Sequence, residues 1–247
     1  MSPTTALVLL AKSPEPKNVK TRLVNGTSDN DYIGLKDVPD TSGRVIGQAE
    51  AYHLAADLYR AFLIDRFRQH QGHGYDVILG TTQPEQSEFF RTITGPHVHH
   101  HAVTGANLGE IMYGIFKDLL VRYQYVIISG SDFPYLDEGV IKQVCRALSS
   151  HDIVLVPAYD GAYNIVGMSQ LHNIFTISRW SSGSELQETV ALLKKRHITH
   201  AVLDDTKLLD IDTIEDLRLL MRDLSDDQAP ITRALLAELL ERLQLMV

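Results

Sequence analysis

The sequence has a single cysteine, no long apolar run and no excess of positive charge. Cys145 is the only cysteine among 247 residues, which excludes an internal disulfide. It lies in a helical pattern, where we expect it to pack rather than react. No run approaches the roughly 20 apolar residues that a membrane-spanning helix needs, and no basic leader precedes a long apolar stretch. We therefore expect no membrane span and a cytoplasmic protein.

The formal net charge of -8 argues against general nucleic-acid binding, which depends on accumulated lysine and arginine. One short stretch departs from this acidic background. Lys12, Lys17, Lys20 and Arg22 fall close together and are opposed only by Glu15. Such a cluster predicts a phosphate-binding site, although a solvated basic turn is the plainer alternative.

Short apolar runs alternate with amphipathic helical patterns along the whole chain. This alternation predicts a single-domain, three-layer α/β/α sandwich with a mainly parallel mixed sheet over residues 1–247. A helix at 230–245 should close the core or join a neighbouring subunit, so a homodimer is possible. The predicted strands are 6–11, 75–80, 97–103, 125–129, 153–157, 165–168 and 201–203. The predicted helices cover 45–71, 84–93, 108–123, 137–148 and 184–196, and a further one opens at Thr213.

Residues 24–44 are rich in Gly, Asn, Asp, Ser and Thr and show no apolar period. They predict a mobile loop of unusual length for a compact domain. A lid over a binding site and a disordered insertion are equally good interpretations.

The first predicted strand ends in a loop that Pro14 and Pro16 stiffen. A preorganised loop loses less entropy when it closes over phosphate oxygens. Lys20 supplies a compact charge and Arg22 a forked guanidinium, which together match phosphate geometry better than lysines alone.

The stretch Gly130–Pro134 follows the buried strand 125–129 and places Asp132 at the tip of that strand. In an open α/β sheet, ligands bind at the carboxyl ends of strands, where a carboxylate can hold a divalent metal against phosphates. Asp212 also ends a strand-like run and is a candidate second ligand. The alternative is that both aspartates only cap helices. Thr213 is expected to cap the following helix with Asp216.

Three further patterns bear on the site. Asp160 and Tyr163 fall in a turn near the same rim, and Trp180 stands in a polar loop, where it could line a pocket or fill the core. His97, His99 and His101 alternate and would face the same side of a strand, which suggests a metal site, but no nearby carboxylate or cysteine completes the ligand set.

Five blocks in the right order resemble the bacterial glycosyltransferase-like proteins related to 2-phospholactate guanylyltransferase. Residues 11–23 are similar to A-K-x-P-x-P-G-x-x-K-T-R-L, and 130–134 to G-S-D-x-P. Residues 157–163 resemble P-A-x-D-G-G-Y, 180–181 resemble W-S, and 210–217 resemble D-V-D-T-x-E-D-L. Lys17 and Ala162 each replace a glycine of these motifs.

The resemblance implies the GT-A, or nucleotide-diphospho-sugar transferase, fold with Mg²⁺ or Mn²⁺ held by Asp132 and Asp212. It implies the following roles by position. The expected catalytic residues are Lys20, Arg22 and Asp132; the nucleotide-binding residues are Ala11, Lys12, Ser13, Lys20, Arg22, Leu108 and Ser131; the acceptor-binding residues are Asp160, Gly161, Tyr163, Trp180 and Ser181.

These observations lead to three functional hypotheses. The first is a metal-dependent nucleotidyltransferase that moves a nucleoside monophosphate from an NTP to a small phosphate- or carboxylate-bearing acceptor, because three cations in the first loop suit a triphosphate. The second is a glycosyltransferase that uses a nucleotide sugar. The third is a non-catalytic nucleotide-binding subunit, since a fold does not guarantee chemistry.

Overall fold

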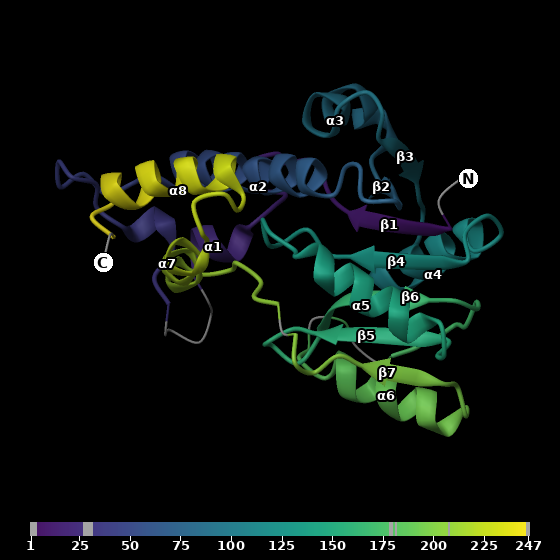
Figure 1. The fold of residues 1–247 in the computed structure, drawn as a ribbon. Helices are drawn as coiled ribbons and strands as arrows, with labels where there is room; N and C mark the ends of the chain where they lie inside the picture. Colours follow the sequence, from purple (N-terminus) through teal and green to yellow (C-terminus); the bar gives the residue numbers. More distant parts are fainter. Residues whose placement is uncertain (1–3, 27–31, 178–179, 181, 207, 246–247) are drawn as a thin grey trace.

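A seven-stranded sheet forms the centre of the computed structural model (Figure 1). The structure describes residues 4–26, 32–177, 180, 182–206 and 208–245. The strand order is β3-β2-β1-β4-β6-β5-β7, and β6 is the only strand among the described residues that runs against its neighbours. The strands are β1 (Thr5–Leu10), β2 (Asp76–Thr81), β3 (His99–Ala102), β4 (Tyr125–Ser129), β5 (Ile153–Pro157), β6 (Tyr163–Met168) and β7 (His200–Val202).

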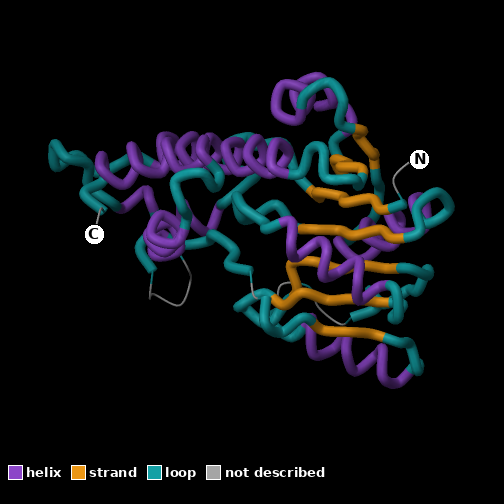
Figure 2. Tube along the Cα trace, viewed as in Figure 1, coloured by secondary structure: helices purple, strands orange, loops and turns teal. Residues whose placement is uncertain are grey.

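The helices are α1 (Thr21–Asn25), α2 (Gln48–Gln69), α3 (Ser87–Thr94), α4 (Leu108–Leu119), α5 (Glu138–Leu148), α6 (Glu185–Lys195), α7 (Ile214–Asp223) and α8 (Pro230–Arg242), with short 3-10 turns η1 (Leu35–Asp37) and η2 (Pro84–Gln86). Helices lie on both faces of the sheet, whereas α7 and α8 lie beside it, next to α2 (Figure 2). Alternate strand residues point to opposite faces and so create two cores. Leu7 and Leu9 face the core built by α2, α5, α7 and α8, whereas Ala6 and Val8 face the one built by α4 and α6.

The predicted α/β sandwich with its mainly parallel mixed sheet is confirmed. The β-branched runs 125–129 and 153–157 form strands with the predicted bounds. The expected helix at 84–93 begins as the 3-10 turn η2 and continues as α3. The expected C-terminal helix is shorter than predicted, because α8 ends at Arg242.

The described part of residues 24–44 is packed rather than lying free of the core. Leu35 and Val38 are buried, and the backbone N–H of Thr41 donates to the carbonyl of Arg242 at the end of α8. Pro39 forms a β-bridge with Val45. The stretch has no apolar period, but its single apolar residues Leu35 and Val38 pack into the core, and the backbone hydrogen bond of Thr41 joins it to the end of α8.

Among the described residues, no helix combines the length and the hydrophobicity needed to cross a membrane.

The turn between β5 and β6 depends on Gly161. Its φ of 89° lies in the left-handed region, and an added Cβ would come within 2.1 Å of the carbonyl oxygen of Gly183. Only glycine permits both this conformation and this close approach. Gly43 has a similar φ of 82°, but nothing lies within 4 Å of its missing Cβ.

We predict that Gly161→Ala lowers the free energy of unfolding by about 3 kcal/mol or more, because it adds a backbone clash to the conformational strain. The matched variant Gly43→Ala carries only the strain and should lose about 1 kcal/mol. Urea unfolding of both variants measures the difference, and equal losses would contradict the close approach.

Candidate active site

The candidate site lies where the chain changes direction across the sheet. From β1 the chain builds β2 and β3 on one side, and β4 then pairs with β1 on the other side. The carboxyl ends of β1 and β4 therefore flank the topological switch point, where open α/β sheets bind ligands. The loop after β1 carries Lys12 and Lys20, and the turn after β4 carries Asp132.

A buried ammonium group joins the acids at this point. The Lys20 side chain is 1% exposed, and its Nζ lies 2.6 Å from Asp132 Oδ1 and 3.9 Å from Asp212 Oδ1. The same Nζ donates to the backbone carbonyl of Asp132 at 3.1 Å and lies over the ring of Phe62. The structure thus brings together two carboxylates that are 80 positions apart in the sequence.

Arg22 extends the cluster toward solvent. Its side chain is 57% exposed, and its guanidinium donates to Asp212 Oδ2 at 2.9 Å. Asp212 is the residue before the N-cap of α7, where Thr213 and Asp216 form the predicted capping box. Capping is therefore performed by Thr213 and Asp216, while the side chain of Asp212 turns to the two cations.

The cations set the charge of Asp132. Its desolvation raises the pKa of the carboxyl, but attraction to Lys20, followed by Lys12 and Arg22, outweighs this and holds the pKa below its usual value. Asp132 is consequently ionised at neutral pH. An ionised carboxylate at this edge is the form that binds a cation.

Asp210 behaves in the opposite way. Burial, then repulsion by Asp132, raises its pKa to about 7; Lys20 opposes this rise, and Asp212 and Asp160 add to it. Its Oδ1 is buried and has no hydrogen-bond partner. No separate role is predicted for Asp210 from the sequence, although its alternation with Asp212 in an extended segment indicates that both can face the same side.

The donor set suits a hard divalent cation. Mg²⁺ is commonly held by one or two carboxylates together with substrate phosphates. Asp132 and Asp212 supply such a pair, and Asp210 adds an unpartnered buried oxygen beside them. Among the described residues, no three or more His, Cys, Asp or Glu side chains are placed so that they alone could hold a metal ion. The residues therefore fit a metal that a nucleotide helps to bind.

The loop after β1 is held in place by residues after β2. Ser13 N donates to Gln83 Oε1 at 2.7 Å, and Gln86 Nε2 donates to Glu15. The Ser13 hydroxyl is buried without a partner, Ala11 is buried, and Lys12 is exposed. Lys12 is therefore an exposed charged side chain of this loop that is accessible to a ligand.

Ser131, predicted to bind nucleotide, and Tyr163, predicted to bind the acceptor, have buried hydroxyls. The Ser131 hydroxyl donates to the carbonyl of Leu10 at 2.8 Å, so it is already engaged inside the protein. The Tyr163 hydroxyl is buried near Thr189 and Glu185, and burial raises its pKa to about 12. The ligand-binding roles of both residues stay predictions.

Of the remaining predicted acceptor residues, Asp160 interacts with the acids of the site, and Trp180 packs elsewhere. Asp160 caps its own turn by accepting from Ala162 N at 3.0 Å, and its charge reaches Asp210. Trp180 packs against Phe175 and against Gly109 at the start of α4. The neighbouring Leu108, predicted to bind nucleotide, is 42% exposed. Ser181 lies outside the described residues.

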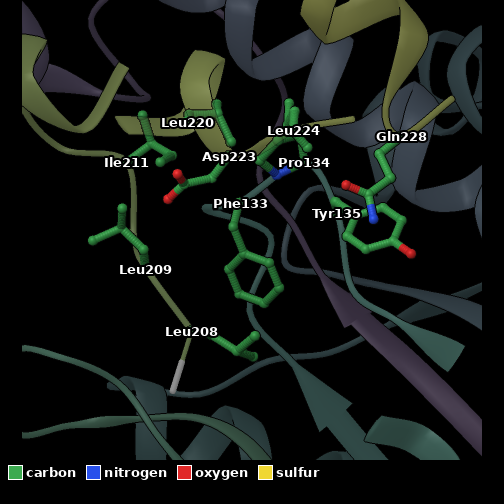
Figure 3. A pocket seen from close by; sticks show the side chains of 10 residues that line it. All are labelled: Phe133, Pro134, Tyr135, Leu208, Leu209, Ile211, Leu220, Asp223, Leu224 and Gln228. Atoms are coloured by element: carbon green, nitrogen blue, oxygen red, sulfur yellow. The ribbon is translucent and has the colours of Figure 1, made fainter. Parts of the chain in front are cut away.

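A small apolar pocket of about 190 Å³ lies beside the acids (Figure 3). Phe133, which follows Asp132, forms part of its wall, and so does Ile211, which separates Asp210 from Asp212. The backbone N–H of Ile211 donates to the carbonyl of Asp132 at 3.2 Å. This contact ties together the two acidic segments.

The histidine pattern does not form a metal site among the described residues. His100 contacts Ser87 and Thr94, and His101 lies 3.3 Å from Asp118. Residues 99–101 thus connect the edge strand β3 to α3 and α4.

Comparisons with known proteins agree with this fold. A family model described as "Uncharacterized protein conserved in bacteria (DUF2064)" matches residues 65–182, which is slightly less than half of the chain. None of the curated proteins matches the sequence. A solved structure from Desulfovibrio desulfuricans G20, described as a candidate nucleotide-diphospho-sugar transferase, is 26% identical, covers 100% of both chains and has a TM-score of 0.79.

Two more distant structures are similar over most of their length. The 4-diphosphocytidyl-2C-methyl-D-erythritolsynthase of Anaerococcus prevotii DSM 20548 is 10% identical, with 95% of this chain and 96% of that chain covered and a TM-score of 0.50. Rv0371c from Mycobacterium tuberculosis H37Rv, solved in complex with manganese, is 13% identical, with 90% and 100% covered and a TM-score of 0.46. At these identities, the first shows the fold alone, and the manganese describes only the second protein. The fold of this chain is therefore that of the nucleotide-diphospho-sugar transferases.

The raised pKa of Asp210 makes stability depend on pH. In the unfolded chain this carboxyl ionises near pH 3.8, whereas in the folded protein it stays protonated up to about pH 7. The folded state thus loses stability as pH rises from about 4 to 7, by a few kcal/mol, since one pKa unit corresponds to about 1.4 kcal/mol.

We predict that Asp210→Asn, which cannot ionise, is more stable than the wild type at pH 8 in the presence of EDTA, and that this advantage disappears near pH 4.5. Urea unfolding of both proteins across this range measures it. A difference that does not change with pH would show that Asp210 is not protonated in the folded protein.

Proposed function

We propose that this chain is a metal-dependent nucleotidyltransferase, one domain over residues 1–247, that transfers a nucleoside monophosphate from an NTP to a small acceptor bearing a phosphate or carboxylate. The observation that supports it most is the convergence of Lys20 and Arg22 with Asp132 and Asp212 at the switch point of the sheet. Cations and carboxylates that meet at this position are what polyphosphate chemistry requires.

The cations would act on the triphosphate. Lys12 is exposed in the loop after β1, and Arg22 presents an exposed guanidinium beside it. These groups stabilise the charge that builds on the leaving pyrophosphate while an acceptor oxygen attacks the α-phosphorus. Preorganised charge of this kind usually contributes the largest part of the rate enhancement.

Asp132 and Asp212 would hold the divalent ion, Mg²⁺ or Mn²⁺, which would supply further neutralisation of the negative charge on the triphosphate. Lys20 is buried beneath these acids and keeps them together when the ion is not bound. The side formed by Asp160, Gly161 and Trp180 is left for the acceptor.

A glycosyltransferase that uses a nucleotide sugar is the second candidate. The description of the Desulfovibrio desulfuricans G20 protein, which matches over the full length, favours it. In that reaction the same acids and cations would stabilise a departing nucleoside diphosphate instead of pyrophosphate.

The two reactions are separated by their products. We predict that incubation with the four NTPs, Mg²⁺ and a panel of small phosphorylated or carboxylated acceptors releases pyrophosphate. Asp132→Asn should lower kcat/KM at least about 100-fold, since it removes one of the two carboxylate charges that would hold the ion on the triphosphate. Coupled pyrophosphate detection measures the rate.

Asp118→Asn is the matched control. Asp118 is exposed to the same degree as Asp132, 56% against 55%, but lies at the far end of α4 beside His101. Its removal should leave kcat/KM unchanged. Release of a nucleoside diphosphate from nucleotide sugars would support the second candidate, and tight nucleotide binding without either product would support a non-catalytic subunit.

A further inference from the structure

Helix α2 packs behind the loop after β1 and the turn after β4, which together make up the site. Polar side chains on its buried face form hydrogen bonds with these two segments. Most of that face is apolar, as the helical spacing predicted. Tyr59, Arg66 and Gln69 interrupt it, and each reaches a backbone or side-chain atom of residues 129–136. Polar groups on a buried face are costly unless a specific contact compensates them.

Tyr59 connects both loops through one hydroxyl. Its oxygen lies 2.6 Å from Ser131 Oγ, and Ser131 Oγ lies 2.8 Å from the carbonyl oxygen of Leu10. A carbonyl can only accept, so Ser131 donates to Leu10 and Tyr59 donates to Ser131. The backbone of Lys12 also hydrogen-bonds the Tyr59 hydroxyl. The chain of contacts therefore runs from α2 through the turn of Asp132 to the end of β1.

Arg66 holds the same turn at its two flanks. Its side chain is fully buried, and its guanidinium donates to Ser129 Oγ at 3.0 Å and to the carbonyl of Phe133 at 3.4 Å. The guanidinium also lies 4.5 Å from the centre of the Phe133 ring. The described residues give Arg66 no carboxylate partner within salt-bridge distance. A buried cation without an ion pair is expensive, and an apolar side chain would fill this space at less cost.

Gln69 completes the support by accepting from the backbone N–H of Leu136 at 3.0 Å. Contacts from α2 thus reach residues 129, 131, 133 and 136, on both sides of Asp132. The helix itself is fixed, because Asp65 accepts from the first backbone N–H groups of α8 at Ile231 and Thr232. These interactions hold the turn without touching the space where a ligand would bind.

We propose that the inner face of α2 is the positioning element of this site, and that Tyr59 is the positioning residue that fixes the turn of Asp132 against the loop of Lys12 and Lys20. The proposal deepens the proposed function, on which its consequence for metal and nucleotide binding rests. A shift of about 1 Å between charged groups costs much of their joint effect on a ligand. The hydroxyl of Tyr59 contacts both sides, because it bonds Ser131 in the turn and the backbone of Lys12 in the loop.

Tyr59→Phe tests this role because it removes one oxygen and leaves the packing of the ring. We expect backbone amides at 129–133 and 11–13 to exchange hydrogen about tenfold faster, which corresponds to the loss of one buried hydrogen bond. The matched control is Tyr123→Phe, which removes a tyrosine hydroxyl bonded to Asp76 at 2.7 Å at the opposite edge of the sheet. It should leave both segments unchanged.

Binding of Mn²⁺ alone, followed by electron paramagnetic resonance, gives the functional readout. Tyr59→Phe should raise the Kd about tenfold, whereas Tyr123→Phe should not change it. Ser131→Ala breaks the same chain of contacts from its middle, so the double variant Tyr59→Phe/Ser131→Ala should be no weaker than the weaker single variant.

The outcomes separate the two proposals. If the wild type binds Mn²⁺ neither alone nor together with any of the four NTPs, the proposed function fails, and the exchange rates still decide the role of Tyr59. Unchanged exchange at 129–133 and 11–13 in Tyr59→Phe would overturn the positioning role. Faster exchange spread evenly over the sheet would also overturn it, because that pattern belongs to a general loss of stability.

Discussion

The buried ammonium of Lys20 is the interaction on which the site depends. It joins the loop after β1, the turn after β4 and the segment before α7, which no other described side chain does. Without it, Asp132 and Asp212 would repel each other and Asp210 with less compensation from positive charge. One cation therefore allows three acids to share a small volume.

Much of this arrangement could be predicted from the sequence. The apolar runs define the strands, and parallel strands place their carboxyl ends on one edge, so Asp132 had to lie near the loop of Lys12 and Lys20. This topology predicts that the basic loop faces Asp132, but it does not predict that Lys20 forms the ion pair. Nor does it predict the burial of Lys20, because in the sequence Lys20 is one of several basic residues in a polar loop. Charge alone does not indicate which lysine turns inward.

The sequence does not predict in which direction a side chain points. The hydroxyls of Ser131, in the turn after β4, and of Tyr163, at the start of β6, are buried in the protein. Tyr59 and Arg66 were hidden for another reason. They lie on a helix whose buried face was defined by its apolar residues, and a polar residue on such a face gives no periodic signal. Ser131 is 72 positions from Tyr59 and Ser129 is 63 positions from Arg66, and only the folded chain brings them together.

The charges of the site also indicate how ligands would enter it. Asp210 is largely protonated below pH 7, so Asp132 and Asp212 are balanced by Lys20 and Arg22, with Lys12 beside them. A divalent ion alone would then leave the site strongly positive, and a triphosphate alone would face two carboxylates. Together they nearly cancel. The arrangement therefore favours a metal and a polyphosphate that bind as a pair. Because α2 holds the turn of Asp132 in place, the acids need little rearrangement when the pair binds.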